Sequence, residues 1–187
     1  MIRLGVLGST NGTDLQTILD SIASGELIGE VSVVLSNRKS AHILERAQNH
    51  NVPAFFLSHK VKSREEFDAE MTAILKEHAV DLVLLIGFMR ILSTKFCQEW
   101  RDRLLNVHPS LLPKYAGGVD TNVHEGVLKN GDTETGCTIH FVTDEVDEVV
   151  PGAELELVNE DLGFGGHVRA PRRYGSTCPH ASGRRRC

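Results

Sequence analysis

The sequence predicts an α/β protein with a doubly wound, mostly parallel sheet, which is a Rossmann-like architecture. Short apolar segments alternate with segments whose apolar residues recur at helical spacing, from the N-terminus to about residue 142. Such alternation is typical of parallel strands joined by crossover helices. One segment, Asp81–Ile86, is almost wholly apolar, as expected of a central parallel strand covered on both faces. The 187 residues, of which 41% are hydrophobic, suffice for one domain with a substantial core.

Five short apolar segments are expected to form the parallel strands: Leu4–Leu7, Val31–Leu35, Pro53–Leu57, Asp81–Ile86 and Arg103–Val107. Helices are expected between them at residues 15–22, at Ala41–His50, after Ser63 and at Ile91–Trp100. Gly25 suits the end of the first helix, because glycine readily adopts the left-handed conformation of a C-terminal cap. Ser63, followed three residues later by Glu66, forms the capping box that begins the third helix.

Two further elements are expected after the last parallel strand. Val119–Lys129 has a helical pattern and is followed by a turn at Asn130-Gly131. Gly136–Val142 alternates apolar with polar residues, which indicates a strand with one exposed face.

The composition excludes several classes of protein. A formal net charge of −5 provides no general reason to expect nucleic-acid binding. No apolar run approaches the roughly 20 residues that span a bilayer, and the N-terminus shows no signal-peptide core. The four cysteines share no metal-binding or disulfide spacing, so free thiols in a reducing cytoplasm are expected: Cys97, Cys137, Cys178 and Cys187.

The stretch Leu104–Gly118 is the first candidate for chemistry. Asn106 and His108 lie two residues apart, so on a strand both side chains point to the same face. Pro109 and Pro113 then end the strand and stiffen the loop that follows it. Open α/β sheets bind ligands at the carboxyl ends of their strands, where these residues lie. The alternative is a histidine without a role in a Pro-rich loop.

The loop after the first strand is the second candidate. Gly8, Gly12 and several hydroxyl side chains lie between a strand and a helix, where backbone N–H groups suit a phosphate. The pattern matches neither a dinucleotide fingerprint nor a P-loop, so a monophosphate site or a plain glycine turn remains open. Asp14 could instead cap the helix, and its charge would repel a phosphate at close range.

A cluster of acids is the third candidate. Thr143–Asp147 carries three carboxylates directly after a strand. One carboxylate beside His108 would raise the pKa of the imidazole and fix its tautomer. A solvated acidic loop is the alternative.

Five segments, in order along residues 2–147, closely resemble the glycinamide ribonucleotide transformylases: Gly8–Gln16, Leu35–Arg38, Gly87–Leu92, Asn106–Tyr115 and Gly136–Asp147. The segment N-V-H-P-S-L-L-P is typical of the folate-dependent formyltransferase fold, and the Gly-rich first loop narrows the resemblance to this family. The resemblance implies transfer of a formyl group from 10-formyltetrahydrofolate to the amine of 5'-phosphoribosylglycinamide in purine biosynthesis. No metal is implied, and the expected protein is a cytoplasmic monomer or homodimer.

The resemblance also implies a role for individual residues. Asn106 would hold the formyl oxygen, His108 would donate the proton, and Asp147 would raise the pKa of His108. Arg64 would approach the folate tail. The folate pocket would be lined, largely through main-chain contacts, by Met89, Arg90, Ile91 and Leu92. The ribonucleotide phosphate would be bound by Gly12, Thr13 and Asp14, although the family usually has Asn where Asp14 stands.

Apart from the resemblance, an asparagine and a histidine suit the chemistry of formyl transfer. Formyl transfer passes through a tetrahedral carbon that carries a negatively charged oxygen. An amide N–H and a protonated imidazole aimed at that oxygen can each contribute about 3 kcal/mol. The other histidines do not gather into a site: His42, His50, His59 and His78 fall on expected surfaces, and His140 would only pack on a strand.

The chain departs from the family after Asp147. Residues 1–160 are expected to form the formyltransferase domain, and residues 161–187 an irregular, disordered tail rich in Arg, Gly and Pro. From Asp161 onward the chain has six arginines, one acid and no lysine. A shifted reading frame would explain this change, and a genuine basic tail that binds polyanions is the alternative.

Three other functions remain open. One is a different formyltransferase or hydrolase of the same fold, acting for example on methionyl-tRNA or a sugar nucleotide. The second is a phosphate- or folate-binding protein without catalytic activity, disabled by its altered C-terminus. The third is a generic doubly wound signalling domain.

Overall fold

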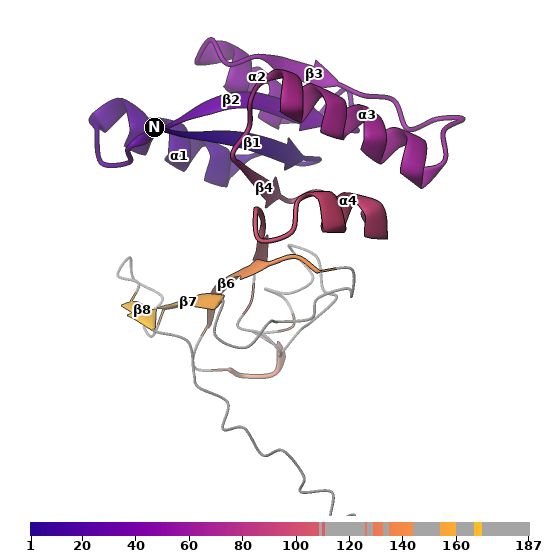
Figure 1. The fold of residues 1–187 in the computed structure, drawn as a ribbon. Helices are drawn as coiled ribbons and strands as arrows, with labels where there is room; N and C mark the ends of the chain where they lie inside the picture. The colour runs from indigo at the N-terminus through magenta and orange to yellow at the C-terminus, as the bar shows by residue number, and fades with distance from the viewer. Residues whose placement is uncertain are drawn as a thin grey trace, which may run out of the picture.

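The computed structural model describes residues 1–108, 110, 126, 129–132, 135–143, 154–159 and 167–169. Within these residues, eight strands form one sheet in the order β3-β2-β1-β4-β5-β6-β7-β8 (Figure 1). The strands are β1 Ile2–Gly8, β2 Gly29–Ser36, β3 Ala54–Phe56, β4 Leu82–Ile86, β5 Leu104–His108, β6 Thr135–Phe141, β7 Glu154–Asn159 and β8 His167–Arg169. The helices are α1 Thr13–Ser24, α2 His42–Asn49, α3 Arg64–Glu77 and α4 Thr94–Glu99.

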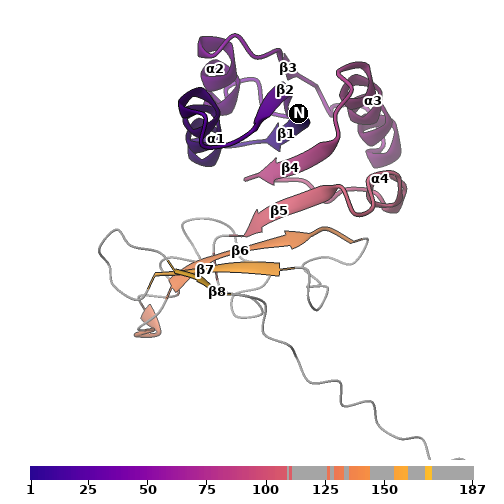
Figure 2. The ribbon, with the colours of Figure 1, turned by 60° about the vertical axis from the view of Figure 1, so that its left-hand side comes forward.

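The first five strands form the parallel part of the sheet. β1 lies between β2 and β4, and the strand order reverses at this point, which is the doubly wound arrangement expected from the sequence. Helices α1 and α2 cover one face, and α3 and α4 cover the other (Figure 2). The predicted fold class is therefore confirmed.

The last three strands extend the sheet in antiparallel fashion. β6 pairs with β5, β7 with β6 and β8 with β7. The expected strand Gly136–Val142 corresponds to β6, which begins one residue earlier. Strand β8 falls inside the segment expected to be an irregular tail, and the other residues after 159 lie outside those described. The division into domains at residue 160 stays a prediction.

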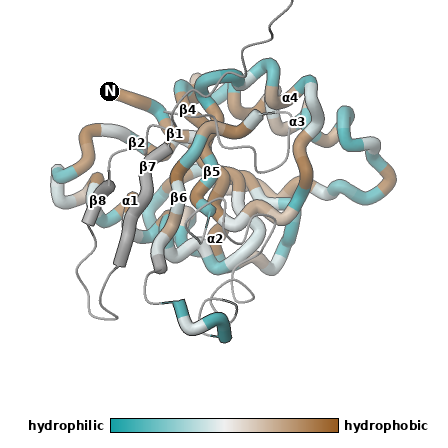
Figure 3. Tube along the Cα trace, turned by 90° about the horizontal axis from the view of Figure 1, so that it is seen from below, coloured by the Kyte–Doolittle hydropathy of each residue, from teal (hydrophilic) through white to brown (hydrophobic). Residues whose placement is uncertain are grey.

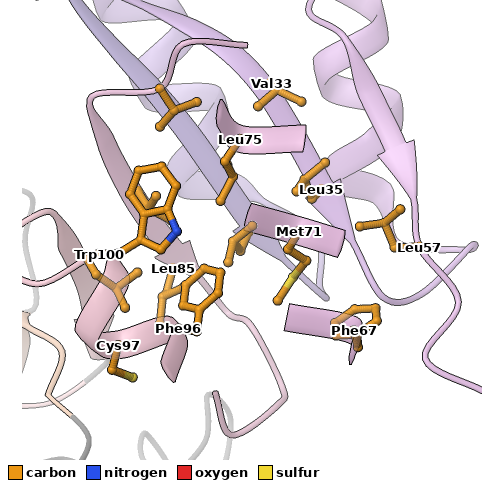
Figure 4. Close-up of a cluster of buried hydrophobic side chains, with 14 residues drawn as sticks. Val33, Leu35, Leu57, Phe67, Met71, Leu75, Leu85, Phe96, Cys97 and Trp100 are labelled. Atoms are coloured by element: carbon orange, nitrogen blue, oxygen red, sulfur yellow. The ribbon is translucent and has the colours of Figure 1, made fainter. Parts of the chain in front are cut away.

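Two hydrophobic cores lie on the two faces of the sheet. The larger core joins α3 and α4 to the strands, and its fully buried side chains include Trp100, Phe96, Phe67, Met71 and Leu75 (Figure 4). The second core joins α1 and α2 to the opposite face through Leu15, Leu19 and Ile43. Apolar residues concentrate in the strands at the centre of the molecule (Figure 3).

The local signals read from the sequence correspond to real element boundaries. At α3, the Ser63 hydroxyl accepts a hydrogen bond from the Glu66 N–H at 3.2 Å, and the Glu66 carboxylate accepts one from the Ser63 N–H at 2.8 Å. Gly25 ends α1 with φ of 80°. Of the expected helix Val119–Lys129, only Gly126 and Lys129 are described, and both are helical. No helix in the described part of the chain is both long and apolar enough to cross a membrane.

Candidate active site

Asn106 and His108 occupy the carboxyl end of β5, beside the loop that follows β4. They are two residues apart on one strand, so their side chains share a face of the sheet. Asn106 is half-buried, and His108 is 4% exposed. Polar side chains of this kind are placed where a ligand of an open α/β sheet binds.

His140 contacts Asn106 from the neighbouring strand. The two residues are directly opposite in the antiparallel β5–β6 register, and Asn106 Nδ2 lies 3.2 Å from His140 Nε2. His140 Nδ1 lies 3.1 Å from the main-chain carbonyl oxygen of Phe141. A carbonyl oxygen only accepts, so Nδ1 carries the proton and Nε2 accepts a hydrogen bond from the Asn106 amide. The imidazole thereby orients the amide.

This role of His140 was not predicted from the sequence, which indicated only a packing residue. The side chain is indeed buried, with 2% exposure. The alternating pattern of β6 placed His140 on a strand, but the pattern does not reveal which strand pairs with it. The missing information was the β5–β6 register, which is a long-range property.

A second buried contact holds the chain just beyond β5. Thr138 lies opposite His108 in the register, and its hydroxyl donates to the main-chain carbonyl of Ser110 at 2.8 Å. Thr138 and Ser110 are 0% and 1% exposed. Buried hydrogen bonds of this kind resist displacement, because breaking one would leave a desolvated polar group. The exit from β5 is therefore fixed relative to His108.

The loop after β4 is tied to two other loops at the same edge of the sheet. The Met89 N–H donates to the Ser9 hydroxyl at 2.9 Å, and that hydroxyl donates to Asn37 Oδ1 at 2.6 Å. Ser9 and Asn37 are both buried. Gly87 has φ of 56°, and a Cβ there would lie 2.4 Å from the Thr10 hydroxyl oxygen. The backbone can approach this closely only at glycine.

The residues expected to line the folate pocket lie in this loop. Met89, Arg90 and Leu92 are half-buried, whereas Ile91 is 59% exposed. The Arg90 guanidinium stacks over the Phe67 ring with 4.9 Å between Cζ and the ring centroid, and its buried Nε has no hydrogen-bond partner. Main-chain groups of this loop are expected to contact folate. One of them, the Met89 N–H, is already bonded to the Ser9 hydroxyl.

Arg64 lies at the start of α3, on the same helix as Phe67. Arg64 is exposed and Phe67 is 1% exposed. Residues three apart on a helix are neighbours on its surface, so Arg64 lies one turn from the ring that carries Arg90. The structure thus brings the two arginines expected to contact folate to the same end of α3.

Gly12, Thr13 and Asp14 form the start of α1. Gly12 has φ of 66°, and a Cβ there would lie 2.5 Å from Ile43 Cγ1, so both conformation and space require glycine. The side chains of Thr13 and Asp14 are exposed, and no side chain caps the helix. Asp14 therefore does not act as the cap, and the first-turn N–H groups of α1 lack that partner.

The turn at α1 lies close enough to β6 to affect a side chain there. Burial raises the pKa of the Cys137 thiol, and the charge of Asp14 raises it further. Cys137 is three residues before His140 on the same strand. The expected phosphate turn and the Asn106–His140 pair therefore adjoin the same strand.

Asp147, the expected carboxylate partner of His108, lies outside the described residues. Its contact with His108 stays a prediction. Cys97 and Cys137 are free thiols, as expected. Among the described residues, no group of three or more His, Cys, Asp or Glu side chains is arranged to hold a metal ion.

The family model described as formyl transferase matches residues 2–155. The chain therefore belongs to the formyl transferase family.

Individual relatives indicate which kind of formyl transferase the chain is similar to. The chain is 41% identical over 164 residues to the phosphoribosylglycinamide formyltransferase of Haemophilus influenzae, covering 86% of this chain and 76% of that protein. It resembles the crystal structure of glycinamide ribonucleotide transformylase 1 from Symbiobacterium toebii with a TM-score of 0.73 and 40% identity, covering 86% of this chain and 76% of that one. Within the formyl transferases, the chain is thus similar to the phosphoribosylglycinamide formyltransferases.

Longer relatives contain a region similar to this chain. The human trifunctional purine biosynthetic protein adenosine-3 is 42% identical over 146 residues, which cover 78% of this chain and 14% of that protein. The chain thus spans a small fraction of the trifunctional relatives.

Proposed function

We propose that this protein transfers a formyl group from 10-formyltetrahydrofolate to the amine of 5'-phosphoribosylglycinamide in purine biosynthesis. Membership of the formyl transferase family and similarity to phosphoribosylglycinamide formyltransferases support the reaction class. One structural observation carries the proposal furthest. The Asn106 amide is oriented by the buried His140 and shares a strand face with the buried His108.

These residues suit the charge that develops during transfer. The substrate amine attacks the formyl carbon, and the formyl oxygen becomes negatively charged. Asn106 gives one N–H to His140 and keeps a second N–H, which can donate to that oxygen. A protonated His108 supplies a second donor, and each donor of this kind contributes about 3 kcal/mol.

The proton balance assigns a further role to His108. The attacking amine loses a proton, and the departing folate nitrogen gains one when the carbon–nitrogen bond breaks. An imidazole can serve both transfers, and general acid–base help of this kind is worth roughly 100-fold in rate. We propose Asp147 as the carboxylate partner of His108 in this role.

The two substrates would approach from opposite sides of the Asn106–His108 strand end. We propose that 10-formyltetrahydrofolate lies along Arg90, Ile91 and Leu92, with its glutamate carboxylates toward Arg64. The position of Arg64 one helical turn from the Phe67–Arg90 stack supports this direction. The phosphate of the ribonucleotide would lie at the start of α1, where backbone N–H groups and the helix dipole favour an anion.

The partners are then small molecules, and we propose that the protein acts in the cytoplasm as a monomer or homodimer without nucleic acid or metal. A sedimentation measurement would separate the two oligomeric states.

Steady-state transfer to 5'-phosphoribosylglycinamide tests the proposal. We expect turnover by the parent chain and a loss of roughly 100-fold or more in kcat for Asn106→Ala and for His108→Ala. Arg101→Ala, an exposed change at the opposite edge of the sheet, should leave kcat unchanged.

Three results would favour the other functions. Formate release without an acceptor indicates a hydrolase. Transfer only to methionyl-tRNA or a sugar nucleotide indicates a different formyltransferase. Folate binding without turnover indicates a non-catalytic binding protein.

A further inference from the structure

The buried carboxylate of Asp68 takes no part in the proposed chemistry. Asp68 lies on α3 and is 3% exposed. Within the described part of the chain, no cation forms an ion pair with it. A buried charge without a cation costs free energy unless hydrogen bonds stabilise it. The hydrogen bond that this carboxylate accepts therefore indicates its role.

That hydrogen bond reaches the end of the loop after β4, residues 87–93. Asp68 Oδ2 accepts from the Ser93 N–H at 2.6 Å, and both residues are buried. A hydrogen bond to a charged acceptor is shorter and stronger than one between neutral groups. Ser93 also begins α4, where its hydroxyl accepts from the Phe96 N–H at 3.3 Å. Asp68 thus fixes the point at which the loop enters α4.

The same loop is held at two further points. The Met89 N–H donates to the buried Ser9 hydroxyl at 2.9 Å. The Arg90 guanidinium stacks over the ring of Phe67, the residue that precedes Asp68 on α3. Neighbouring residues of one helix therefore hold a side chain and a main-chain N–H of the loop.

Three N–H groups without a partner lie between the bonded ones of Met89 and Ser93. Among the described residues, the main-chain N–H groups of Arg90, Ile91 and Leu92 form no hydrogen bond. These are residues whose main-chain groups are expected to contact folate. Backbone that is held at both ends loses less conformational entropy on binding a ligand than a free loop does.

We propose that Asp68 is a positioning residue for the folate co-substrate. Through the Ser93 N–H it holds the loop after β4 in the conformation that binds folate, and it does not touch the folate itself. This inference rests on the proposed function, because the loop is part of the folate site proposed there. Without the hydrogen bond, the loop populates other conformations, and the apparent dissociation constant rises as the competent fraction falls.

Calorimetry on the full chain tests this role without turnover. Asp68→Ala should raise the dissociation constant of tetrahydrofolate about tenfold, as expected if about a tenth of the molecules keep the competent loop. The dissociation constant of 5'-phosphoribosylglycinamide should stay at the parent value, because its proposed phosphate site lies at the start of α1. Asp68→Asn keeps an oxygen that can accept the Ser93 N–H, so it should bind tetrahydrofolate within about twofold of the parent chain.

Two variants of Ser93 form a matched pair at the other end of the hydrogen bond. Ser93→Pro removes the N–H that Asp68 accepts, and the Ser93 φ of −77° lies within the range that proline adopts. Ser93→Ala removes only the hydroxyl, so the hydrogen bond to Asp68 remains. We expect Ser93→Pro to weaken tetrahydrofolate binding about tenfold and Ser93→Ala to leave it unchanged.

A folded Asp68→Ala variant with the parent affinity for tetrahydrofolate overturns the proposal. Equally weak binding by Asp68→Asn and Asp68→Ala also overturns it, because the charge and not the hydrogen bond would then be responsible. If Asp68→Ala does not fold, Ser93→Pro decides, and an affinity equal to that of Ser93→Ala overturns the role. Failure of Ser93→Pro to fold as well would assign the hydrogen bond to folding instead of folate binding.

Turnover separates this inference from the proposed function. A folded parent chain that transfers no formyl group from 10-formyltetrahydrofolate contradicts the proposed function. In an active chain, Asp68→Ala should raise the KM for 10-formyltetrahydrofolate about tenfold and leave kcat and the KM for the ribonucleotide unchanged. An active chain in which Asp68→Ala leaves all three values unchanged contradicts the inference alone.

Discussion

The Asn106 side chain derives its orientation from a residue on the adjacent strand. Its Nδ2 lies 3.2 Å from His140 Nε2, which acts as acceptor because Nδ1 faces the Phe141 carbonyl. An asparagine without such a partner could rotate its amide by half a turn and present oxygen instead of N–H to the substrate. His140 is therefore a positioning residue for the proposed reaction.

Replacing His140 tests this role. We expect His140→Ala to lower kcat about tenfold with little change in KM for either substrate, because the lost hydrogen bond orients Asn106 and touches neither substrate. His140→Gln can still accept from Asn106 and should recover part of the loss. A folded His140→Ala variant with the parent kcat would contradict the assignment.

The Cys137 thiol reports on the charge at the start of α1. Burial is the larger cause of its raised pKa, and Asp14 adds to it. Asp14→Asn removes the charge, so the pKa should fall and the thiolate fraction at pH 8 should rise. We therefore expect iodoacetamide to alkylate Cys137 faster in Asp14→Asn than in the parent chain. Peptide mapping after alkylation measures the rate.

Asp20→Asn provides the matched control for that experiment. Asp20 is also an exposed acid on α1. Asp14, and not Asp20, is the acid whose charge raises the pKa of the Cys137 thiol. An equal alkylation rate in the parent chain and the Asp14→Asn variant would show that burial alone controls the thiol.

At the scale of the element, α3 has the best-defined start. Its capping box was predicted from Ser63 and Glu66 alone, since the residues that make the cap are adjacent in sequence. Ser63 and Glu66, the two residues that form the box, lie within four consecutive residues. Local chemistry of this kind is what a sequence displays directly.

Ser63→Ala should lower the free energy of unfolding by about 1 kcal/mol at neutral pH, since the helix loses an N-cap acceptor. Hydrogen bonds from the Ser63 backbone and side chain lower the pKa of Glu66 from its usual 4.5. The contribution of Glu66 is therefore present above pH 4.5 and is lost as the pH falls through the lowered folded value. The measurement is urea unfolding at several pH values.

Ser24→Ala is the control for the helix cap. Ser24 is exposed at the end of α1, and its hydroxyl only donates to the Ser21 carbonyl. Its removal should change stability by less than about 0.5 kcal/mol. A stability difference between the parent chain and Glu66→Gln that does not change with pH would contradict the role of the carboxylate.

Pairing between elements was the part that the sequence did not reveal. The prediction placed β5 and β6 correctly as strands, but their antiparallel register joins residues far apart in the chain. Without that register, the contact of His140 with Asn106 was not visible, although both residues were named. The roles of Asn106, His108 and the binding residues stay predictions, because geometry places them without showing a substrate.

At the scale of the molecule, the sheet separates two cores. Met71 belongs to the core under α3 and α4, and Ile43 to the core under α1 and α2 (Figure 4 shows the first). Both are 0% exposed. The doubly wound fold was predictable because each of these helices carries its apolar stripe within a single short segment.

The two cores should respond independently to substitution. We expect a loss of about 3 kcal/mol for Met71→Ala and about 1 kcal/mol for Ile43→Val. The double variant should show the sum within about 0.5 kcal/mol, because the two sites share no partner. Urea unfolding of the four chains measures this, and a larger deviation would show that the sheet transmits packing changes between its faces.

The antiparallel pairing of β5 with β6 also bears on how the chain folds. Asn106 and His140 are 34 positions apart, whereas the helices form from near neighbours. Closing a long loop costs more entropy than extending a helix, so contacts at large sequence separation form slowly. The helices and their strands can therefore assemble on a chain that still lacks the Asn106–His140 pair. During refolding, we therefore expect secondary structure to form before the contact between Asn106 and His140.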